Sequence, residues 1–360
     1  MVTHKETEVL HQNSSCSKRE TKSIATLCDL ISQDKILSSR GNLITKVSSL
    51  CIDSRKAIKG CLFFAIEGQN TNGAFYIEEA IDRGAIGVVT EIPLSNHYPV
   101  PFVQVRDVRS VLSSASTNFS NNPDQEIQLI GVTGTNGKTT VSILTKHLFS
   151  SNQPSEKTAV IGTVNYDLGT RVIPSTRTTP EAHDLCELLK SAISTGCTRA
   201  VMEVSSHGIC QQRTSNLNFK TAVFLNLTPE HLDFHSDMEE YYNVKKNFIT
   251  GISNPRPKNA IINLDDDYGK RLFSEIPEGI NKIGFGEDQD SHFRARHIQY
   301  KSTSTLFELE YPDGVIEINS PMIGRFNVQN VLASLAVGWV EGFNVFEMAS
   351  QLSYFKGSPG

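Results

Sequence analysis

A glycine-rich segment in the middle of the chain has the residue types and the order of a phosphate-binding loop. Residues 131–140 read GVTGTNGKTT, between an apolar run and the helical pattern VSILTKHLF. In this context, backbone N–H groups and a helix N-terminus can enclose phosphate. Lys138 can neutralise the outer phosphates, and the Thr139 hydroxyl can hold Mg²⁺. The segment therefore predicts nucleotide binding, although Val132 stands where a strict Walker A motif has glycine.

Two further segments place polar side chains directly after apolar, strand-like runs. Glu203, in MEVSSHG, is expected at the carboxyl edge of a parallel sheet, where such sheets bind ligands. This carboxylate suits Mg²⁺, and a carboxylate that only caps a helix is an equal alternative. His231, Asp233 and His235 follow in NLTPEHLDFH, with a spacing that fits no closed zinc site. From the pattern alone, solvated histidines are the simpler interpretation.

The composition describes an ordinary soluble protein. The 360 residues allow two or three domains, with 38% hydrophobic and 20% charged residues. The charge of -5 and the absence of a basic stripe argue against a nucleic-acid partner. The seven scattered cysteines indicate reduced thiols, and no apolar run approaches the roughly 18 residues of a membrane span. We therefore expect a cytoplasmic protein with no membrane partner.

Two α/β blocks must position these side chains. After a polar tail, residues 1–22, strand-like runs alternate with helical patterns over residues 23–121, which predicts a small α/β domain. The stretch SNNPDQE, residues 120–126, reads as a linker. Residues 122–342 alternate strands and helices, and their continuous apolar runs are typical of a mainly parallel sheet covered on both faces. The predicted fold class is therefore α/β, with a phosphate-loop domain second.

The second block is also predicted in detail. Its strands are expected at Ile127–Thr133, Ala159–Val164, Ala200–Val204, Ala222–Leu227 and Ala260–Leu264. A β-hairpin is expected to pair Tyr300–Tyr311 with Val315–Asn319. Lys245 and Lys246 lie in the helical pattern MEEYYNVKKNFIT, where the pattern predicts a solvated face. Residues 343–360 end in Gly-Ser-Pro-Gly and are expected to connect to a C-terminal domain.

The ordered set of motifs resembles the Mur ligases. GTNGKTT, TTPE (178–181), MEVSSHG, NLTPEHLDFH and GRFNVQNVLAS (324–334) stand in the family's order. Asp53-Ser54-Arg55 followed by GCLFFAIEGQNTNG is similar to the family's uridine-nucleotide domain. The likeness covers about residues 23–360 and is closest to the branch that adds the third amino acid to UDP-N-acetylmuramoyl-L-alanyl-D-glutamate. It implies an ATP-dependent amide-forming ligase of peptidoglycan precursor synthesis, with Mg²⁺ as cofactor.

The resemblance also implies a role for each matching residue. The ATP site is expected to contain Gly134, Thr135, Asn136, Gly137, Lys138, Thr139 and Thr140, with Asn330 near the adenine. The UDP-linked substrate is expected to contact Ser54, Gln69, Asn70, Thr71, Thr178, Thr179, Ser205, Gln211 and Arg213. The expected metal ligands are Thr139, Glu203, His231 and Lys245, the last as a carbamylated lysine whose carbamate reverses the charge. Catalysis is expected to depend on Lys138, Lys245, Glu203 and His231.

The implied reaction transfers a phosphoryl group from ATP to the D-glutamate γ-carboxylate and then an amino group to the resulting acyl phosphate. meso-Diaminopimelate is the first choice for the incoming amino acid, and L-lysine the second. In this family a C-terminal domain holds that amino acid, so we expect this chain, a monomer, to bind its substrates but form little amide alone.

The chain departs from the Mur ligase pattern at two places. Asn72-Gly73-Ala74 stands where Asp-Gly-His is frequent, and Arg177 stands where Asn or an apolar residue is common. Two alternatives are weighed against this ligase. One is a folylpolyglutamate-synthase-like ligase, which would lack the uridine domain, and the other is a non-catalytic nucleotide-binding scaffold. The scaffold is disfavoured by the intact set of Lys138, Thr139, Glu203, His231 and Lys245.

Overall fold

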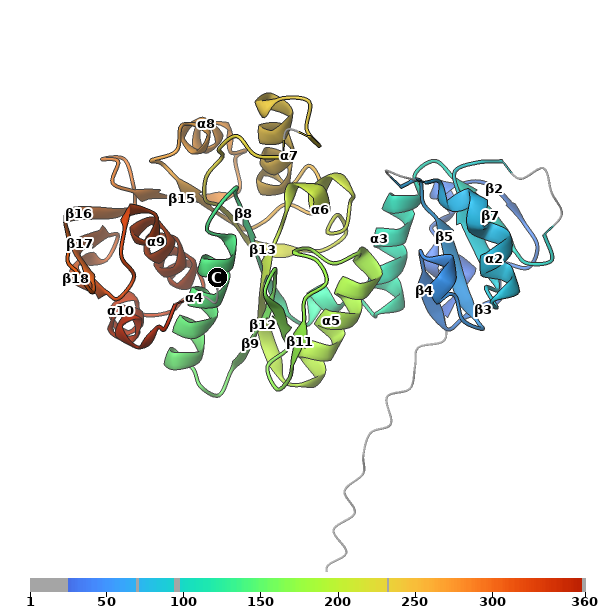
Figure 1. The fold of residues 1–360 in the computed structure, drawn as a ribbon, viewed down its shortest axis with the longest axis horizontal. Helices are drawn as coiled ribbons and strands as arrows, with labels where there is room; N and C mark the ends of the chain where they lie inside the picture. Colours follow the sequence, from blue (N-terminus) through green and yellow to red (C-terminus); the bar gives the residue numbers. More distant parts are fainter. Residues whose placement is uncertain (1–24, 69–70, 94–97, 232, 358–360) are drawn as a thin grey trace, which may run out of the picture.

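The computed structural model describes residues 25–68, 71–93, 98–231 and 233–357, which form two α/β units side by side (Figure 1). The predicted fold class is confirmed. The N-terminal unit ends with helix α3, and the central unit begins at strand β8, next to the phosphate loop. In the described part of the chain no helix combines the length and the apolar character needed to cross a membrane.

The N-terminal unit is built on a five-stranded sheet in the order β2-β7-β6-β5-β4. Its main elements are β2 (Ile36–Arg40), β4 (Ser49–Cys51), β5 (Cys61–Ala65), α2 (Ile77–Asp82), β6 (Gly87–Thr90), β7 (Phe102–Val105) and α3 (Val108–Phe119); β1 (Ala25–Thr26), α1 (Leu27–Leu30) and β3 (Lys46–Val47) lie beside them. Every residue of β5 is buried: Leu62 and Phe64 face one apolar core, and Phe63 faces the other. Alternating residues therefore fill two cores, as the continuous apolar run predicts.

The central unit contains an eleven-stranded sheet in the order β11-β10-β9-β12-β8-β13-β14-β15-β16-β17-β18. Its strands are β8 (Gln128–Thr133), β9 (Lys157–Ile161), β10 (Asn165–Asp167), β11 (Val172–Pro174), β12 (Cys197–Glu203), β13 (Phe219–Phe224), β14 (Asn259–Asn263), β15 (Asn281–Gly286), β16 (Phe293–Tyr300), β17 (Thr305–Tyr311) and β18 (Gly314–Ser320). All pairings from β9 to β16 are parallel, and those at the two ends are antiparallel. The parallel strands bring their carboxyl ends, and the loops that follow them, to one edge.

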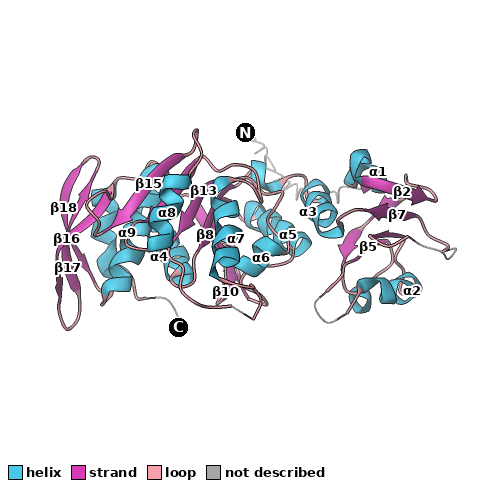
Figure 2. Ribbon diagram, turned by 90° about the horizontal axis from the view of Figure 1, so that it is seen from above, coloured by secondary structure: helices cyan, strands magenta, loops and turns pink. Residues whose placement is uncertain are grey.

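Helices cover both faces of this sheet (Figure 2). They are α4 (Lys138–Asn152), α5 (Ala182–Ser194), α6 (Ser206–Cys210), α7 (Met238–Thr250), α8 (Asp267–Glu275), α9 (Arg325–Val340) and α10 (Val345–Gln351). Ile130 and Val132 of β8 pack in a core with α4, α9 and α10, whereas Leu129 packs in a core with α5, α7 and α8. Strand β8 is thus held from both faces, and the loop after it has a rigid base.

The strand predictions are correct in position within three residues, but the predicted hairpin is wrong in extent. Strand β17 begins at Thr305, because Lys301 donates its backbone N–H to Ser304 O at 2.8 Å and closes a turn before it. The segment predicted as one long strand therefore joins β16 to β17, and three antiparallel strands replace the hairpin. Strands β15 and β16 were missed, because exposed polar residues begin β15 and occupy much of β16, so neither is a continuous apolar run.

The two units meet along α3 and α5, which lie side by side (Figure 1). Ala182 of α5 belongs to the apolar core of the N-terminal unit. The predicted linker also packs into the structure: Asp124 is nearly buried and accepts the Asn218 backbone N–H at 3.2 Å. The connection between the units is consequently anchored, and side chains from both can share one cavity.

Candidate active site

The phosphate loop connects β8 to α4 and depends on two glycines. Gly134 and Gly137 have φ angles of +152° and +88°, a region that favours glycine. A Cβ atom on Gly137 would also lie 2.6 Å from Asn330 Oδ1, and one on Gly134 would lie 2.9 Å from Leu225 Cβ. The loop therefore keeps its backbone close to its neighbours and directs it toward the N-terminus of α4, where the helix dipole favours an anion.

Lys138 folds back onto the loop that it follows. Its Nζ donates to Gly134 O at 2.9 Å and to Thr135 O at 2.7 Å. Burial lowers the pKa of this lysine, and Glu203 and Glu230 oppose the shift. The ammonium is thus bound by neutral carbonyls and stays available to a phosphate that would neutralise it.

Glu203 lies at the end of β12, with only 1% of its surface exposed. Its carboxylate accepts the Thr139 hydroxyl at 2.9 Å, the Thr163 hydroxyl at 2.9 Å and the Thr163 backbone N–H at 2.8 Å. Thr163 escaped the sequence prediction, because a threonine after a strand carries no signal of its own. Three donors hold this buried carboxylate in one orientation beside the phosphate loop.

A pocket of about 240 Å³ opens in front of the loop and Glu203. Its lining brings together most of the predicted ATP and metal residues: Thr135, Asn136, Gly137, Lys138, Thr139, Thr140, Glu203 and His231, with Thr163, Thr178 and Ser205. This donor set offers one carboxylate and several hydroxyl oxygens, ligand types that Mg²⁺ prefers. The lining therefore fits Mg²⁺ chemically, and the roles of Thr139, Glu203 and His231 as its ligands stay predictions.

Lys245 is buried, with 1% of its surface exposed, which corrects the solvated face expected from the pattern of α7. Its Nζ donates to Gly134 O at 3.1 Å and to Thr133 Oγ1 at 3.3 Å, 4.7 Å from the ring centre of Tyr241. Lys138 donates to the same Gly134 oxygen. Burial, and next the charge of Lys138, hold the pKa of Lys245 well below its ordinary value. The neighbouring Lys246 pairs with Glu275 at 2.5 Å on the surface.

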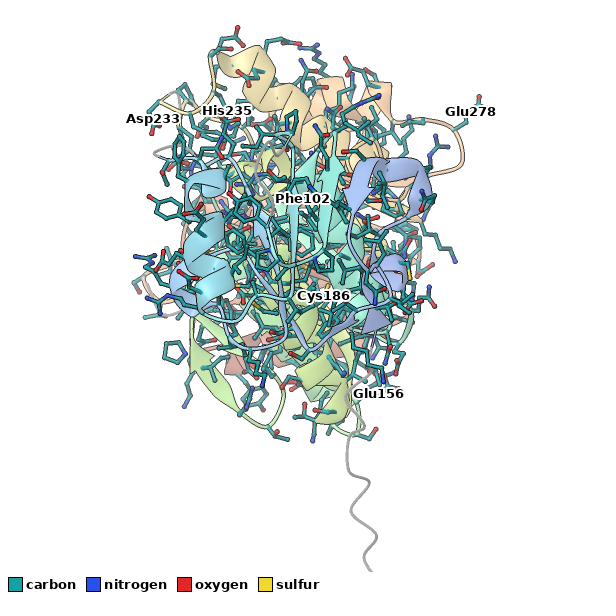
Figure 3. The ribbon with its side chains drawn as sticks, turned by 90° about the vertical axis from the view of Figure 1, so that its right-hand side faces the viewer. Phe102, Glu156, Cys186, Asp233, His235 and Glu278 are labelled. Atoms are coloured by element: carbon teal, nitrogen blue, oxygen red, sulfur yellow. The ribbon has the colours of Figure 1, made fainter. Side chains whose placement is uncertain are left out.

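The loop after β13 places aromatic and histidine rings around this pocket. His231 is exposed and has a φ of +59°, and its ring lies 5.2 Å from that of His207. His235 is buried against Tyr241, with ring centres 4.7 Å apart, so its predicted solvation is wrong. Figure 3 shows Asp233 and His235 at one edge of the molecule, opposite Glu156. Neither ring nitrogen of His235 has a hydrogen-bond partner in the described part of the chain, and burial lowers its pKa.

A second cavity, of about 610 Å³, lies between the two units and is named here the seam cavity. Ser54, Thr71 and Gln211, three residues predicted for the UDP-linked substrate, line it together with Arg109, Arg177 and Glu181. The Ser54 hydroxyl donates to Glu79 at 2.7 Å. The predicted residues Gln69 and Asn70 lie outside the described residues.

The Arg213 guanidinium binds other residues of the protein. Its Nη1 donates to Thr179 O at 2.7 Å, and its Nη2 contacts Gln211 Oε1 and lies 2.9 Å from a Glu181 oxygen. Thr179, also buried, donates its hydroxyl to Glu203 O at 2.9 Å. Arg213 and Thr179 thus hold residues that line the seam cavity and the phosphate-loop pocket. The family resemblance did not predict this supporting role. Their direct contact with substrate stays a prediction.

Asn330 lines a third pocket, of about 130 Å³, beside the phosphate loop. Phe326, 77% exposed, and Phe285 line it with Asn136 and Gly137. The pocket shares Asn136, Gly137 and Thr140 with the pocket in front of the loop, and an adenine near Asn330 stays a prediction. Phe326 belongs to the quoted GRFNVQNVLAS segment, but its role was not predicted.

Comparison with known proteins agrees with this geometry. Residues 132–338 match the family described as Mur ligase middle domain. The "UDP-N-acetylmuramoyl-L-alanyl-D-glutamate--2,6-diaminopimelate ligase" of Solibacter usitatus is 37% identical over 316 residues, 88% of this chain and 63% of that protein. The protein of the same name from Caldanaerobacter subterraneus is 36% identical, with 88% and 64% covered. The chain thus spans less than two thirds of the length of these relatives.

Solved structures give the same result. One that carries the name of the same diaminopimelate ligase has a TM-score of 0.80 at 26% identity, covering 94% of this chain and 68% of that one. The "apo form of L. casei FPGS" has a TM-score of 0.51 at 15% identity, covering 67% of this chain and 66% of that one, a likeness of fold alone. The phosphate loop, the buried Glu203 and the matches over most of the chain agree: this chain belongs to the Mur ligase family.

Proposed function

We propose that this chain carries the nucleotide and substrate sites of an ATP-dependent ligase that adds an amino acid to UDP-N-acetylmuramoyl-L-alanyl-D-glutamate. The observation that carries the proposal is the pair Lys138 and Lys245, which share the oxygen of Gly134 beside the fixed carboxylate of Glu203. The names of the relatives support the substrate and favour 2,6-diaminopimelate over lysine. The proposal includes a cytoplasmic location and a monomer.

Lys138 would leave the carbonyls of its own loop when ATP binds. Phosphate oxygens offer it full negative charge, which makes hydrogen bonds about twice as strong as those to neutral oxygens. Thr139, Glu203 and His231 would hold Mg²⁺, which neutralises phosphate charge when bound. The nucleotide would then lie along the loop, with its base toward Asn330 and Phe326.

Lys245 would react with CO₂ because burial lowers the pKa of its amine, which favours the neutral form that can attack. The nitrogen lone pair attacks the carbon of CO₂, and the amine loses a proton to solvent, which leaves a carbamate. The carbamate then places a negative charge next to the Lys138 ammonium, so the two groups attract each other. The polar contacts at Thr133 and Gly134 hold the new group near the metal residues.

The reaction proper needs two displacements. An oxygen of the D-glutamate γ-carboxylate attacks the γ-phosphorus and ADP leaves, with Lys138 neutralising the charge on the transferred group. The amino group of the incoming amino acid then attacks the acyl carbon, loses a proton, and phosphate leaves. Thr178 and Ser205 line the pocket at which the γ-carboxylate would arrive.

A coupled assay tests the function. ATP, Mg²⁺ and the UDP-dipeptide are supplied with diaminopimelate or with lysine, and tripeptide and phosphate are both measured, with and without the region that follows in the full-length relatives. We expect ATP and UDP-dipeptide to bind, and tripeptide to form with diaminopimelate when that region is added. Failure to bind ATP-Mg²⁺ would refute the ligase and favour a scaffold. Phosphate release driven by a folate instead of the UDP-dipeptide would favour the synthase alternative.

A further inference from the structure

Helix α7 contacts the phosphate loop at two consecutive residues. Lys245 donates to the carbonyl oxygen of Gly134, and the Tyr241 hydroxyl lies 3.3 Å from Thr135 Oγ1. Tyr241 and Lys245 are four residues apart, so they lie on one face of the helix. The proposed reaction assigns a role to Lys245 and none to Tyr241. Because only 1% of Tyr241 is exposed, it can affect a ligand of the pocket only through the loop.

The hydroxyl of Thr135 is fully used within the protein. Its Oγ1 accepts the Thr228 backbone N–H at 3.0 Å and donates to Thr228 O at 3.3 Å. A hydroxyl has one hydrogen, so the Tyr241 hydroxyl is the donor in its contact with Thr135. One donated and two accepted hydrogen bonds fill the capacity of the Thr135 oxygen. Thr135 lines the pocket, but its side chain has no hydrogen bond left for a nucleotide.

The backbone of Thr135 makes contacts that shape the loop. Its N–H donates to Asn226 O at 3.0 Å, and its carbonyl oxygen accepts Lys138 Nζ at 2.7 Å. The next residue, Asn136, donates its N–H to Asn226 Oδ1 at 2.9 Å. A shift of the Thr135 side chain would therefore move both the loop backbone and the lysine that is predicted to meet phosphate.

The Tyr241 ring is held in place by its neighbours. The His235 ring stacks on it, with ring centres 4.7 Å apart and an angle of 24° between the planes. Lys245 Nζ lies 4.7 Å from the centre of the Tyr241 ring. A packed ring fixes the direction of its hydroxyl, so the contact with Thr135 is preorganised.

We propose that the Tyr241 hydroxyl holds the phosphate loop in its ATP-binding shape through Thr135. The Thr135 hydroxyl is then a support of the loop and not a ligand of the nucleotide. When Lys138 leaves the Thr135 carbonyl for a phosphate, the loop loses one internal contact. The contact from Tyr241 stays, so the loop backbone need not rearrange when ATP binds. The inference rests on the proposed function only in taking ATP as the ligand of the loop.

Calorimetric titration of the whole chain with ATP-Mg²⁺ tests the role of the hydroxyl. Tyr241→Phe keeps the ring and removes the hydrogen bond to Thr135, so we expect an affinity about fivefold lower, the effect of one neutral hydrogen bond. The matched control is Tyr242→Phe, because Tyr242 is the next residue of α7, is also buried and donates its hydroxyl to Glu275 of α8 at 2.8 Å. Its ATP affinity should stay within about twofold of the wild type. An unchanged ATP affinity in Tyr241→Phe would contradict the proposal.

A double-mutant cycle distinguishes positioning from a general loss of packing. Thr135→Val removes the acceptor, so adding Tyr241→Phe to it should lower the ATP affinity no further. Thr135→Ser keeps the hydroxyl, so it should bind ATP like the wild type and restore the effect of Tyr241→Phe. Losses that add in the double variant of Thr135→Val and Tyr241→Phe would overturn the proposal, because the tyrosine would then act independently of Thr135. Thermal melts of each variant verify that it is folded.

Amide hydrogen exchange without nucleotide separates this inference from the ligase itself. In Tyr241→Phe, the amides of Thr135 and Asn136 should exchange about fivefold faster than in the wild type, and in Tyr242→Phe they should not. Unchanged exchange at both amides in Tyr241→Phe would overturn the proposal. If the wild type failed to bind ATP-Mg²⁺ while this exchange depended on Tyr241, the ligase would fall and the role of Tyr241 in the loop would stand.

Discussion

The phosphate-loop pocket and the seam cavity hold their charged groups in different ways. Around the phosphate loop, Lys138 and Lys245 donate to neutral oxygens and Glu203 accepts from hydroxyls, and no ion pair joins these three among the described residues. Lys245 is buried and is not among the residues that line the pocket. In the seam cavity, Arg177 and Arg213 are paired directly with Glu181. Because the lysines and the Glu203 carboxylate are not paired with each other, they would be available to a polyanion and a metal. The seam keeps them paired, with three arginines around the one carboxylate of Glu181.

The two regions also differ in how they are assembled. The pocket takes its residues from loops at one edge of one sheet. The seam cavity needs α3 of one unit and the segment before α5 of the other. Substitutions in the pocket should therefore change ligand binding with little effect on the contact between units, whereas substitutions at the seam should affect both.

The largest effect is expected for Lys138→Ala. Loss of the ammonium should lower the affinity for ATP-Mg²⁺ roughly 100-fold, because a buried charge-assisted contact to phosphate is worth on the order of 3 kcal/mol. UDP binding in the seam cavity should not change. Lys146→Ala is the matched control, since Lys146 lies on the same helix and pairs with Asp167. Equal ATP affinity for the wild type and Lys138→Ala would contradict the assignment of the loop.

Lys245→Met is expected to stabilise the fold. The folded-state pKa of Lys245 is lowered, so the unfolded chain binds more protons between that pKa and the ordinary lysine value of about 10.4. The lysine therefore costs stability at pH 7, and the cost disappears as the pH rises toward about 10.4. Chemical denaturation in CO₂-free buffer should show the variant more stable by about 1–3 kcal/mol at pH 7.

Adding bicarbonate makes the denaturation test of Lys245→Met more specific. Carbamylation of the wild type should reduce the advantage of Lys245→Met, because the buried amine is replaced by a group that Lys138 can neutralise. A ¹³CO₂-labelled carbamate signal should appear in the wild type alone. A variant that is less stable than the wild type at every pH would show that Lys245 is a charged structural residue.

The smallest effect is expected at the edge of the seam. Asp107 caps α3 through Ser110 N at 2.9 Å and accepts Gln212 Nε2 of the central unit at 2.6 Å. Asp107→Ala should cost about 1–2 kcal/mol of stability, measured by denaturant titration. Asn344→Ala removes a cap from α10 with no contact between units, so it is the control and should cost less. A change in ATP affinity for Asp107→Ala would show that the seam cavity and the phosphate-loop pocket are not independent.

Much of the fold followed from the sequence pattern. Met238–Thr250 is a helix with the predicted bounds, because Asp237 caps it at its N-terminus. The sheet of the central unit was predicted because its strands are continuous apolar runs. Strands β15 and β16 were not, although they lie inside the sheet, since exposed polar residues interrupt their apolar pattern.

The sequence by itself determined the phosphate loop, because its glycines, Lys138 and Thr139 are adjacent in the chain and need only local backbone geometry. Only the tertiary structure decided the burial of Lys245, which lowers its pKa, and the grouping of the arginines around Glu181. A lysine in a helix reads as solvated until the neighbours that bury it are known, and Arg109, Arg177 and Arg213 are distant in sequence. The physical reason is that pKa values and charge clusters depend on distance and burial in space, which spacing along the chain does not encode.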